Sequence, residues 1–405
     1  MKRFTIGIIR ERKSPPDERV PLTPDQCRQI KLKYQELHIL VEPSPIRCFS
    51  DDAYRAQGLD VRDDLSDCDV LIGVKEVPAD ALIPNKKYVF FSHTYKKQPY
   101  NRALLAEILE KHITLYDYEL MRAPNGRRLI GFGRYAGVVG AYNALRGYGL
   151  RSRRYELKAA HKCADRAEVN EELKRVSLPR GFRIVVTGTG RVAGGALEIL
   201  RDAGIREMRP DEFVDRMVDD PVYTQLSLSQ YFTPKDGGAF DRATFAHQPE
   251  KFRSNFMKYA QGSDMYIACH YWSEGSPFLF SRADARDPRF DIQFVADISC
   301  DIDGPVASTL RPSFIADPFY GYDPYTEEEV DWNHSNAIGV MAVDNLPCEL
   351  PADASADFGE EFMEHILPAF LNGDPNEILH RAQETDETGE LTETFSYLAD
   401  WVAGK

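Results

Sequence analysis

A glycine-rich turn between an apolar run and a helical pattern limits the folds open to this chain. Residues 182–200 read FRIVVTGTGRVAGGALEIL. The apolar run at 184–186 predicts a strand, and the apolar spacing from Ala196 to Leu200 predicts a helix. The turn between them matches the G-x-G-x-x-A pattern of a dinucleotide-binding unit. An α/β domain with a mostly parallel sheet is therefore expected around this stretch.

Each small residue of this turn has a physical use in such a unit. The first glycine permits the tight turn, the second lets the backbone approach a pyrophosphate, and the alanine lets the helix pack on the strand. The helix N-terminus then offers free N–H groups to the phosphates. We expect the cofactor to lie against Gly188, Gly190, Arg191, Val192 and Ala193. The same pattern also occurs in turns that bind no phosphate.

The nucleotide preference depends on the strand that follows the glycine-rich turn. An acidic residue about 20 positions on usually binds the adenosine ribose. Residues 205–211 read IREMRPD, which is unusually polar for a strand. Asp211 and Glu207 are candidates for the ribose contact, whereas Arg206 and Arg209 would suit a 2′-phosphate. The cofactor is thus expected to be NAD or NADP, with NAD favoured.

The bulk composition narrows the class of protein. With 405 residues and 43% hydrophobic content, the chain has the size of two domains. Its formal net charge of -14 argues against nucleic acid or an anionic membrane as a partner. The seven scattered cysteines include no C-x-x-C pair, so no metal site is expected. We expect a cytoplasmic enzyme, monomeric or a small homo-oligomer.

Reactive side chains follow three predicted strands of the first 120 residues. Strand 69–74 is followed by Lys75, strand 88–91 by His93 and Lys96, and strand 114–117 by Glu119. Strands and helices alternate here, which predicts a parallel sheet whose carboxyl ends share one edge. These side chains should therefore face one cleft. The segment 126–134 adds arginines, among them Arg128, whose guanidinium suits a carboxylate but could also form a surface ion pair.

Several motifs together resemble one enzyme family. They are DERVPLTP at 17–24, GVKE at 73–76, FFSHTYK at 90–96, YDYE at 116–119 and VDNLP at 343–347. The set is similar to the lysine-forming saccharopine dehydrogenases and to the lysine-ketoglutarate reductase portion of aminoadipic semialdehyde synthase. Alanine dehydrogenase and the transhydrogenase N-terminal domain share the first motif.

The resemblance implies two Rossmann-like α/β domains with mostly parallel sheets and a cleft between them. Residues 1–135 plus 336–405 would form the substrate domain, and 136–335 the dinucleotide-binding domain. The implied reaction interconverts saccharopine with lysine and 2-oxoglutarate through an imine and an NAD(P)-dependent hydride transfer. By the same resemblance, Lys75 and His93 are the acid–base pair, Arg19, Lys96 and Arg128 hold substrate carboxylates, Glu119 tunes the site, and Asp344 lies beside the nicotinamide.

Two other functions stay open at the level of sequence. One is an alanine dehydrogenase or another amino-acid or imine oxidoreductase, which would share Arg19, Lys75 and His93. The other is a catalytically silent nucleotide-sensing protein, although an intact Lys75–His93 pair speaks against it. Single residues also have structural alternatives: His93 could be a packing histidine, and Asp344 part of a capping turn.

Overall fold

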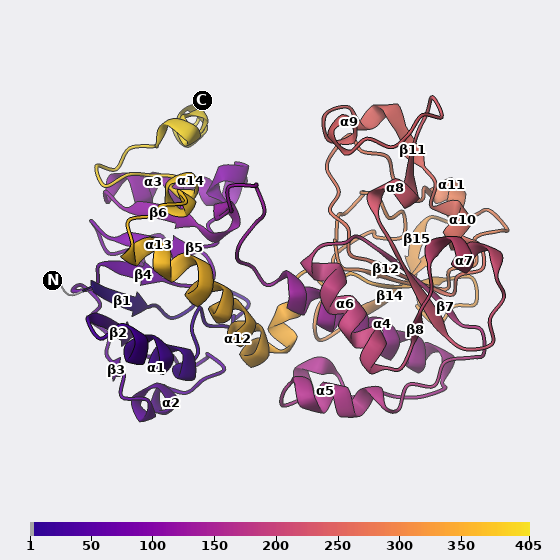
Figure 1. Cartoon of the computed structure of the whole chain (residues 1–405), viewed down its shortest axis with the longest axis horizontal. Coiled ribbons are helices and arrows are strands. Elements are labelled where there is room, and N and C mark those ends of the chain that lie inside the picture. Colours follow the sequence, from indigo (N-terminus) through magenta and orange to yellow (C-terminus); the bar gives the residue numbers. More distant parts are fainter. Residues whose placement is uncertain (1–3) are drawn as a thin grey trace. The chain divides into compact units, whose positions relative to one another are not determined.

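The chain forms two compact units in the computed structural model, which describes residues 4–405. The first unit joins the chain up to Phe132 with Pro351–Lys405, and the second is Gly133–Leu350 (Figure 1). We expected the return to the first unit near residue 336. Strand β16 (Ile338–Met341) instead pairs with the second sheet, so the return follows at Pro351.

The first unit is a six-stranded parallel sheet covered by helices. Its strand order is β3-β2-β1-β4-β5-β6, and each neighbouring pair is parallel. The strands are β1 (Phe4–Ile8), β2 (Leu37–Val41), β3 (Asp60–Val61), β4 (Val70–Ile72), β5 (Lys87–Phe90) and β6 (Thr114–Asp117). The helices are α1 (Pro24–Lys33), α2 (Asp51–Ala56), α3 (Arg102–Glu110), α12 (Pro351–Glu361), α13 (Leu367–Leu371), α14 (Ile378–Ala382) and α15 (Ala399–Val402). Short 3-10 turns are η1 (Ala79–Ala81), η2 (Thr94–Lys96), η3 (Pro99–Asn101), η4 (Tyr118–Leu120) and η9 (Glu393–Leu398), and η8 (Phe362–Ile366) is a π-helical turn.

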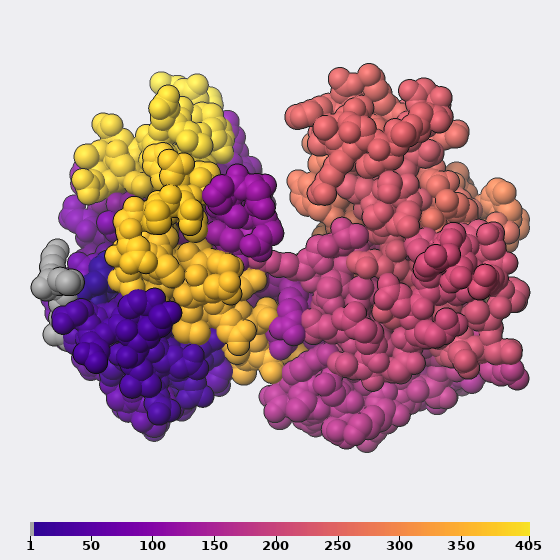
Figure 2. All heavy atoms as spheres, viewed as in Figure 1, coloured from indigo at the N-terminus to yellow at the C-terminus, as the bar shows by residue number. Residues whose placement is uncertain are grey.

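Both faces of this sheet are apolar because alternate residues of each strand point to opposite sides. On β5, Val89 joins the core that contains α1, α12 and α13, whereas Tyr88 and Phe90 join the core beneath α3. Figure 1 shows α12 and α13 lying across the sheet, and Figure 2 shows the yellow C-terminal atoms against the N-terminal ones. The last 55 residues are therefore an integral layer of this unit.

The second unit is an eight-stranded mixed sheet, with order β15-β14-β16-β13-β12-β7-β9-β8. Its strands are β7 (Arg183–Thr187), β8 (Arg206–Glu207), β9 (Val222–Leu226), β12 (Met265–Ala268), β13 (Phe294–Asp297), β14 (Phe319–Asp323), β15 (Glu328–Val330) and β16; β10 (Phe232–Pro234) and β11 (Phe252–Ser254) form a separate hairpin. The helices are α4 (Gly133–Ser152), α5 (Arg166–Leu173), α6 (Arg191–Asp202), α7 (Pro210–Asp215), α8 (Leu228–Tyr231), α9 (Arg242–His247), α10 (Met257–Ala260) and α11 (Arg282–Ala285), with 3-10 turns η5 (Ala160–Lys162), η6 (Pro249–Lys251) and η7 (Leu346–Glu349).

The glycines of α4 serve close helix packing inside the second unit. A Cβ added at Gly137 would overlap the carbonyl oxygen of Val192 in α6, and one at Gly195 would overlap that of Arg134. The two helices approach at backbone distance because neither carries a side chain there. Helix α4 lies wholly within the second unit. Among the helices of residues 4–405, none is long and apolar enough to cross a bilayer.

Candidate active site

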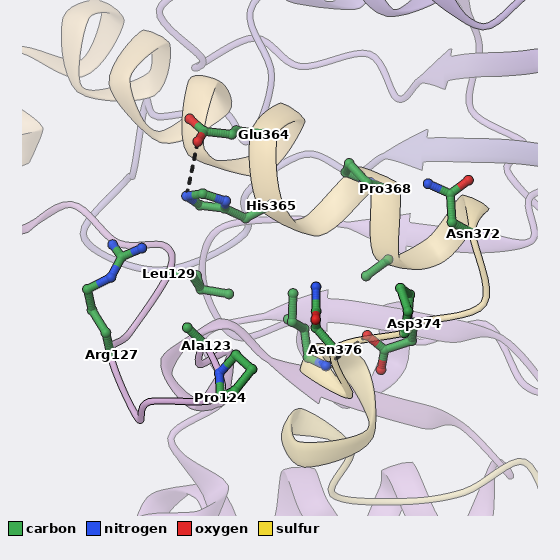
Figure 3. A pocket seen from close by; sticks show the side chains of 13 residues that line it. Ala123, Pro124, Arg127, Leu129, Glu364, His365, Pro368, Asn372, Asp374 and Asn376 are labelled. Carbon is green, nitrogen blue, oxygen red and sulfur yellow. Dashed lines mark hydrogen bonds and ion pairs between the residues drawn. The ribbon is translucent and has the colours of Figure 1, made fainter.

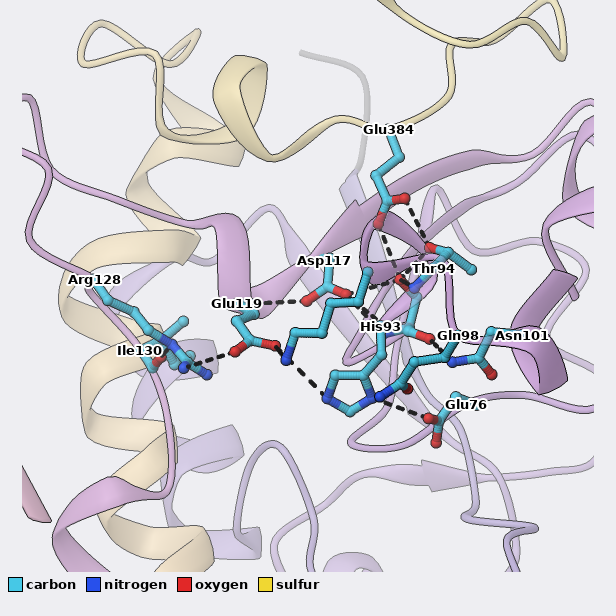
Figure 4. Close-up of polar contacts among 12 residues, drawn as sticks. Glu76, His93, Thr94, Gln98, Asn101, Asp117, Glu119, Arg128, Ile130 and Glu384 are labelled. Atoms are coloured by element: carbon cyan, nitrogen blue, oxygen red, sulfur yellow. Dashed lines mark hydrogen bonds and ion pairs between the residues drawn. The ribbon is translucent and has the colours of Figure 1, made fainter. Parts of the chain in front are cut away.

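Parallel pairing brings three of the predicted residues to one edge of the first sheet. Strands β4, β5 and β6 are adjacent and in register, so the residues that follow them leave the sheet side by side. His93 Nε2 lies 3.7 Å from Glu119 Oε2, and Glu76, which follows Lys75, contacts the other side of the same imidazole (Figure 4). Lys75, Glu76, His93 and Glu119, which follow the three strands, therefore lie together as one polar group, the strand-end cluster.

His93 lies between two carboxylates that act on different ring nitrogens. Its Nδ1 is 3.0 Å from Glu76 Oε1, and its Nε2 faces Glu119. Burial alone would raise the pKa of Glu76, but the hydrogen bond from His93 and the charge of Lys13, 3.0 Å away, lower this pKa to about 2. An ionised Glu76 can only accept, so Nδ1–H donates to it. Nε2, the nitrogen that faces Glu119, is therefore the atom of His93 at which a proton can be gained or lost.

Glu119 is the shared partner of two of the cations expected to hold substrate carboxylates. Lys96 Nζ lies 2.7 Å from its Oε2, and Arg128 Nη1 lies 3.5 Å from its Oε1. Burial opposes ionisation of Glu119, but the Lys96 contact and the Arg128 charge keep its pKa below the usual value. Arg128 Nε also donates to the carbonyl of Ile130 at 2.9 Å. Both cations therefore point at the cluster, each already facing an internal carboxylate.

The Lys75 amine is held in a different electrostatic setting. Burial lowers its pKa, and the nearby charges of Arg19 and Lys13 lower it further. Among residues 4–405, its Nζ has no hydrogen-bond or ion-pair partner. Its backbone N–H is fixed by Glu11, whose Oε2 accepts it at 2.8 Å. Lys75 is therefore an amine that gives up its proton more readily than a surface lysine.

Arg19 is buried in an ion pair rather than open to the cluster. Its Nε and Nη2 lie 3.0 and 2.6 Å from the two carboxylate oxygens of Asp17, and its guanidinium lies 4.2 Å from the centre of the Phe132 ring. Burial would raise the pKa of Asp17, but Arg19 holds it below its usual value. In this structure Arg19 supplies a fixed positive charge beside Lys75.

Two acidic residues without a predicted role form hydrogen bonds to residues of the cluster or to their neighbours. Asp117, the last residue of β6, accepts the backbone N–H groups of His93 and Glu119 at 2.9 and 2.7 Å. Glu384, from the C-terminal segment, contacts Ser92. Asp117 lies in the YDYE motif at 116–119, in which the resemblance implies a role for Glu119 alone. No local signal around Glu384 distinguished it from the other acidic residues of the C-terminal segment.

Arg127 and Arg128 are adjacent in sequence but lie in different surroundings. Arg127 lines a surface cavity of about 250 Å³, together with His365 and Asp374 (Figure 3). Arg128 faces Glu119 instead. Of the two neighbours, only Arg128 contributes to the strand-end cluster.

In the second unit, the predicted glycine-rich turn has the geometry of a phosphate cradle. Gly188 has φ +99°, and a Cβ there would lie 2.5 Å from the carbonyl oxygen of Cys269. Gly190 is the N-cap of α6, has no side-chain cap, and has open space where a Cβ would be. The first N–H groups of the helix are thus left for an anion. Arg191 and Val192 begin α6, and Ala193, in the first turn of this helix, is buried. These residues fit the pyrophosphate of a dinucleotide.

The strand order bears on the expected ribose partner Asp211, whose contact with the cofactor stays a prediction. Residues 205–211 do not form the strand next to β7, because β9 lies there and β8 lies beyond it at the edge. Asp211 belongs to α7 and is paired with Arg209 at 3.0 Å. The position beside the turn is the end of β9, where residues 226–230 read LSLSQ. No carboxylate stands in this pentapeptide.

Asp344 lies beyond the carboxyl end of β16 and is exposed. Strands β7, β12, β13 and β16 are parallel neighbours, so their carboxyl ends share one edge with the glycine-rich turn. Asp344 therefore lies along the edge at which a dinucleotide binds in such sheets. Its expected place beside the nicotinamide stays a prediction.

Comparison with known proteins agrees with this architecture. Residues 7–139 match the family model described as alanine dehydrogenase/PNT, N-terminal domain. The chain is 32% identical, over 97% of its length, to alpha-aminoadipic semialdehyde synthase of Arabidopsis thaliana, of which it covers 41%. It is 24% identical to the saccharopine dehydrogenase [NAD(+), L-lysine-forming] of Yarrowia lipolytica, with 90% of each chain covered.

A solved structure of L-alanine dehydrogenase superposes with a TM-score of 0.65 at 14% identity, covering 98% of this chain and all of the other. That likeness confirms the predicted α/β fold with Rossmann-like domains. The chain spans less than half the length of the semialdehyde synthases that it matches. Residues 7–139 thus resemble an alanine dehydrogenase/PNT N-terminal domain, and the chain is similar over most of its length to proteins named saccharopine dehydrogenase [NAD(+), L-lysine-forming] and alpha-aminoadipic semialdehyde synthase.

Proposed function

We propose that this protein is an NAD(P)-dependent oxidoreductase that interconverts saccharopine with lysine and 2-oxoglutarate. The observation that carries the proposal is the strand-end cluster of the first unit. It joins a lysine of lowered pKa, a histidine with a directed Nε2, and cations suited to carboxylates. Homology to enzymes named for this reaction supports the choice of substrates.

The acid–base residues suit a reaction that forms and hydrolyses an imine. Such a reaction needs several proton transfers at an amine nitrogen and a carbinol oxygen. His93 takes and returns a proton at Nε2, while Glu76 keeps the Nδ1 proton in place. Lys75 offers a second group for proton transfer, an amine whose pKa is lowered by burial. We assign His93 and Lys75 as the acid–base pair on this basis.

The carboxylates of the substrates need cations, which the acidic chain must supply locally. Lys96 and Arg128 both reach the cluster, and Arg128 has the planar fork that suits a carboxylate. Arg19 is held by Asp17 in this structure, so we propose that its charge acts on the cluster without leaving that pair.

A nicotinamide dinucleotide would supply or accept the hydride when bound. The glycine-rich turn and the uncapped start of α6 would hold its pyrophosphate. The end of β9 lacks the carboxylate that repels a 2′-phosphate, so we propose that NADP(H) is accepted as well as NAD(H). Asp344 would lie near the reacting ring. The amino donor, the 2-oxo acid and the nucleotide are decided by one assay.

That assay follows nicotinamide absorbance with the pure protein and NADH or NADPH. Lysine plus 2-oxoglutarate should oxidise the nucleotide, and the faster nucleotide gives the preference. Oxidation with pyruvate plus ammonia instead would assign alanine dehydrogenase activity. A protein that binds nucleotide and is silent with both pairs would contradict the proposed substrates.

Two substitutions test the residue roles. Lys75→Met and His93→Gln should each lower kcat by roughly 10² to 10⁴, the usual contribution of a general acid or base. Lys87→Met is the matched control for the lysine, because Lys87 is exposed at the opposite end of β5. His112→Gln is the control for the histidine, because His112 also has a left-handed backbone, with φ 52°. Turnover within a few-fold of the parent in either site variant would remove that residue from the acid–base assignment.

A further inference from the structure

The C-terminal segment reaches the back of the strand-end cluster by pairing with strand β6. Gln383 forms an antiparallel bridge with Tyr116, and the N–H of Glu384 donates to the carbonyl of Leu115 at 2.9 Å. Thr385 Oγ1 accepts the Leu115 N–H at 2.9 Å. This pairing buries the Glu384 side chain completely, with its carboxyl group directed at Ser92 and Thr94 (Figure 4).

Asp117 links that carboxyl group to the residues of the proposed reaction. Its Oδ2 accepts the N–H groups of Ser92 and His93, each at 2.9 Å, and its Oδ1 accepts that of Glu119 at 2.7 Å. His93 has a left-handed backbone with φ 54°, which costs energy unless neighbours hold it. The Asp117 carboxylate is therefore a clamp on the backbone of both His93 and Glu119.

Counting hydrogens shows that the network needs a proton on a carboxyl group. Ser92 Oγ lies 2.7 Å from Asp117 Oδ2 and 3.0 Å from Glu384 Oε1, and Thr94 Oγ1 lies 2.7 Å from Glu384 Oε2 and 2.6 Å from Ser92 Oγ. Two hydroxyl groups supply only two hydrogens for these four contacts. Asp117 already accepts three backbone N–H groups, which stabilise its charge, so a third hydrogen is assigned to Glu384. Glu384 then donates to Thr94, Thr94 to Ser92, and Ser92 to Asp117, which places one hydrogen in each of the three shortest contacts.

The surroundings of Glu384 favour the same protonation state. Burial raises its pKa to about 8, and the charge of Asp117 adds to this effect. Three titratable groups lie around Glu384: Asp117 on β6, His93 on the far side of Asp117, and Tyr397 on η9. Burial raises the pKa of Asp117 as well, but the hydrogen bonds that it accepts from backbone N–H groups and from Ser92 oppose this effect. The pKa of Tyr397 is raised by burial and by Glu384. Within residues 4–405, no lysine or arginine pairs with Glu384.

We propose that Glu384 is a positioning residue of this site, which in its neutral acid form holds Ser92 on Asp117 and thereby fixes the backbones of His93 and Glu119. Loss of its proton would place two carboxylates around one hydroxyl hydrogen and loosen the clamp. The proposal rests on the proposed function for its kinetic consequence, because His93 acts there. Its structural part, a neutral buried Glu384, stands on the geometry alone.

The first test uses three variants and the pH dependence of kcat. Glu384→Gln keeps a neutral donor and acceptor, so its kcat at neutral pH should stay within a few-fold of the parent. In the parent, kcat should fall near pH 8 as Glu384 loses its proton, and this fall should be weaker in Glu384→Gln. Glu384→Ala should lose on the order of 10²-fold in kcat, as expected for a misplaced acid–base group, with nucleotide binding unchanged. Glu387→Gln, an exposed neighbour, should behave as the parent. An identical pH profile in Glu384→Gln and the parent would overturn the proposal.

A second measurement needs no turnover and so separates this proposal from the proposed function. Infrared spectroscopy of the full chain at pH 7 should show a protonated carboxyl band in the parent minus Glu384→Gln difference spectrum, and the band should disappear by pH 10. If the parent is inactive with every substrate pair but the band is present, the proposed function fails and the neutral Glu384 stands. If the band is missing at pH 7, the neutral Glu384 is wrong whatever the activity.

Discussion

Glu11 provides a quantitative test of the electrostatics beneath Lys75. Its two carboxylate oxygens accept the N–H groups of Val74 and Lys75 at 2.7 and 2.8 Å. Burial raises its pKa from 4.5 to about 8, against the lowering effect of these hydrogen bonds and of Arg19. The folded protein therefore keeps a proton on Glu11 at pH values where an unfolded chain has lost it.

The sign and size of the effect follow from this difference in proton binding. Below pH 4.5 both states carry the proton, and above pH 8 neither does, so the contribution of Glu11 changes only in between. In that window the folded state binds more protons, so a rise in pH destabilises it. Each pH unit costs about 1.36 kcal/mol. Between pH 5.5 and 7.5 the loss is about 3 kcal/mol, and across the whole window about 5 kcal/mol.

Glu11→Gln removes this titration, so the parent and the variant should differ by an amount that depends on pH. Relative to the parent, the variant should gain about 3 kcal/mol of unfolding free energy from pH 5.5 to pH 7.5. Urea unfolding measures it, with a reporter confined to the first unit because the two units need not unfold together. Trp401 is such a reporter once Trp272 and Trp332 of the second unit are replaced by phenylalanine.

The control for this experiment is Glu18→Gln, an exposed residue of the same loop. Its unfolding free energy should follow the parent at every pH. A difference between Glu11→Gln and the parent that stays constant from pH 5.5 to 7.5 would refute the reasoning, because it would mean that Glu11 is ionised in the folded protein. A stability that rises with pH in the parent alone would refute it as well.

Three further outcomes test other parts of the structure. Asp17→Asn should destabilise the first unit by about 3–5 kcal/mol, because Arg19 loses its buried carboxylate; Trp401 fluorescence in urea measures this. Thr23→Ala should cost about 1 kcal/mol in the same assay, because Thr23 and Gln26 form the capping box of α1. Gly188→Ala should abolish NADPH binding in a fluorescence titration while Gly204→Ala does not, because only at Gly188 would a Cβ meet the backbone, 2.5 Å from Cys269 O. Equal binding by both glycine variants would contradict the predicted cradle.

The parts of the fold that the sequence predicted well have strong local signals. Thr23 and Pro24 mark the start of α1, and the structure begins the helix at Pro24. The apolar runs before Lys75, His93 and Glu119 are strands β4, β5 and β6, which pair in parallel as neighbours in one sheet. Because parallel strands end at one edge, a local pattern was enough to predict a nonlocal cluster.

The parts that the sequence missed depend on strand order or on distant pairing. Local pattern does not say that β9, rather than residues 205–211, lies beside β7, and the ribose contact assigned to Asp211 stays a prediction. Sequence pattern likewise gives no sign of β14 and β15, which form a hairpin beside β16. Charged residues on β15 are exposed at the sheet edge, so they carry no apolar alternation that would reveal a strand.

The cations of the cluster show why its acidic residues are as much a part of the site as its basic ones. Lys96 and Arg128 both face the ionised Glu119, so one internal carboxylate offsets part of their two positive charges. A substrate carboxylate that approaches these cations must share them with Glu119 or displace it. Its binding free energy is therefore the difference between two ion pairs and not the full energy of one. Binding of moderate strength that responds to the state of Glu119 is therefore expected of this site. Since Asp117 fixes the backbone of Glu119 and His93 together, the group that offsets the charge and the group that we propose moves the proton are held by the same buried carboxylate.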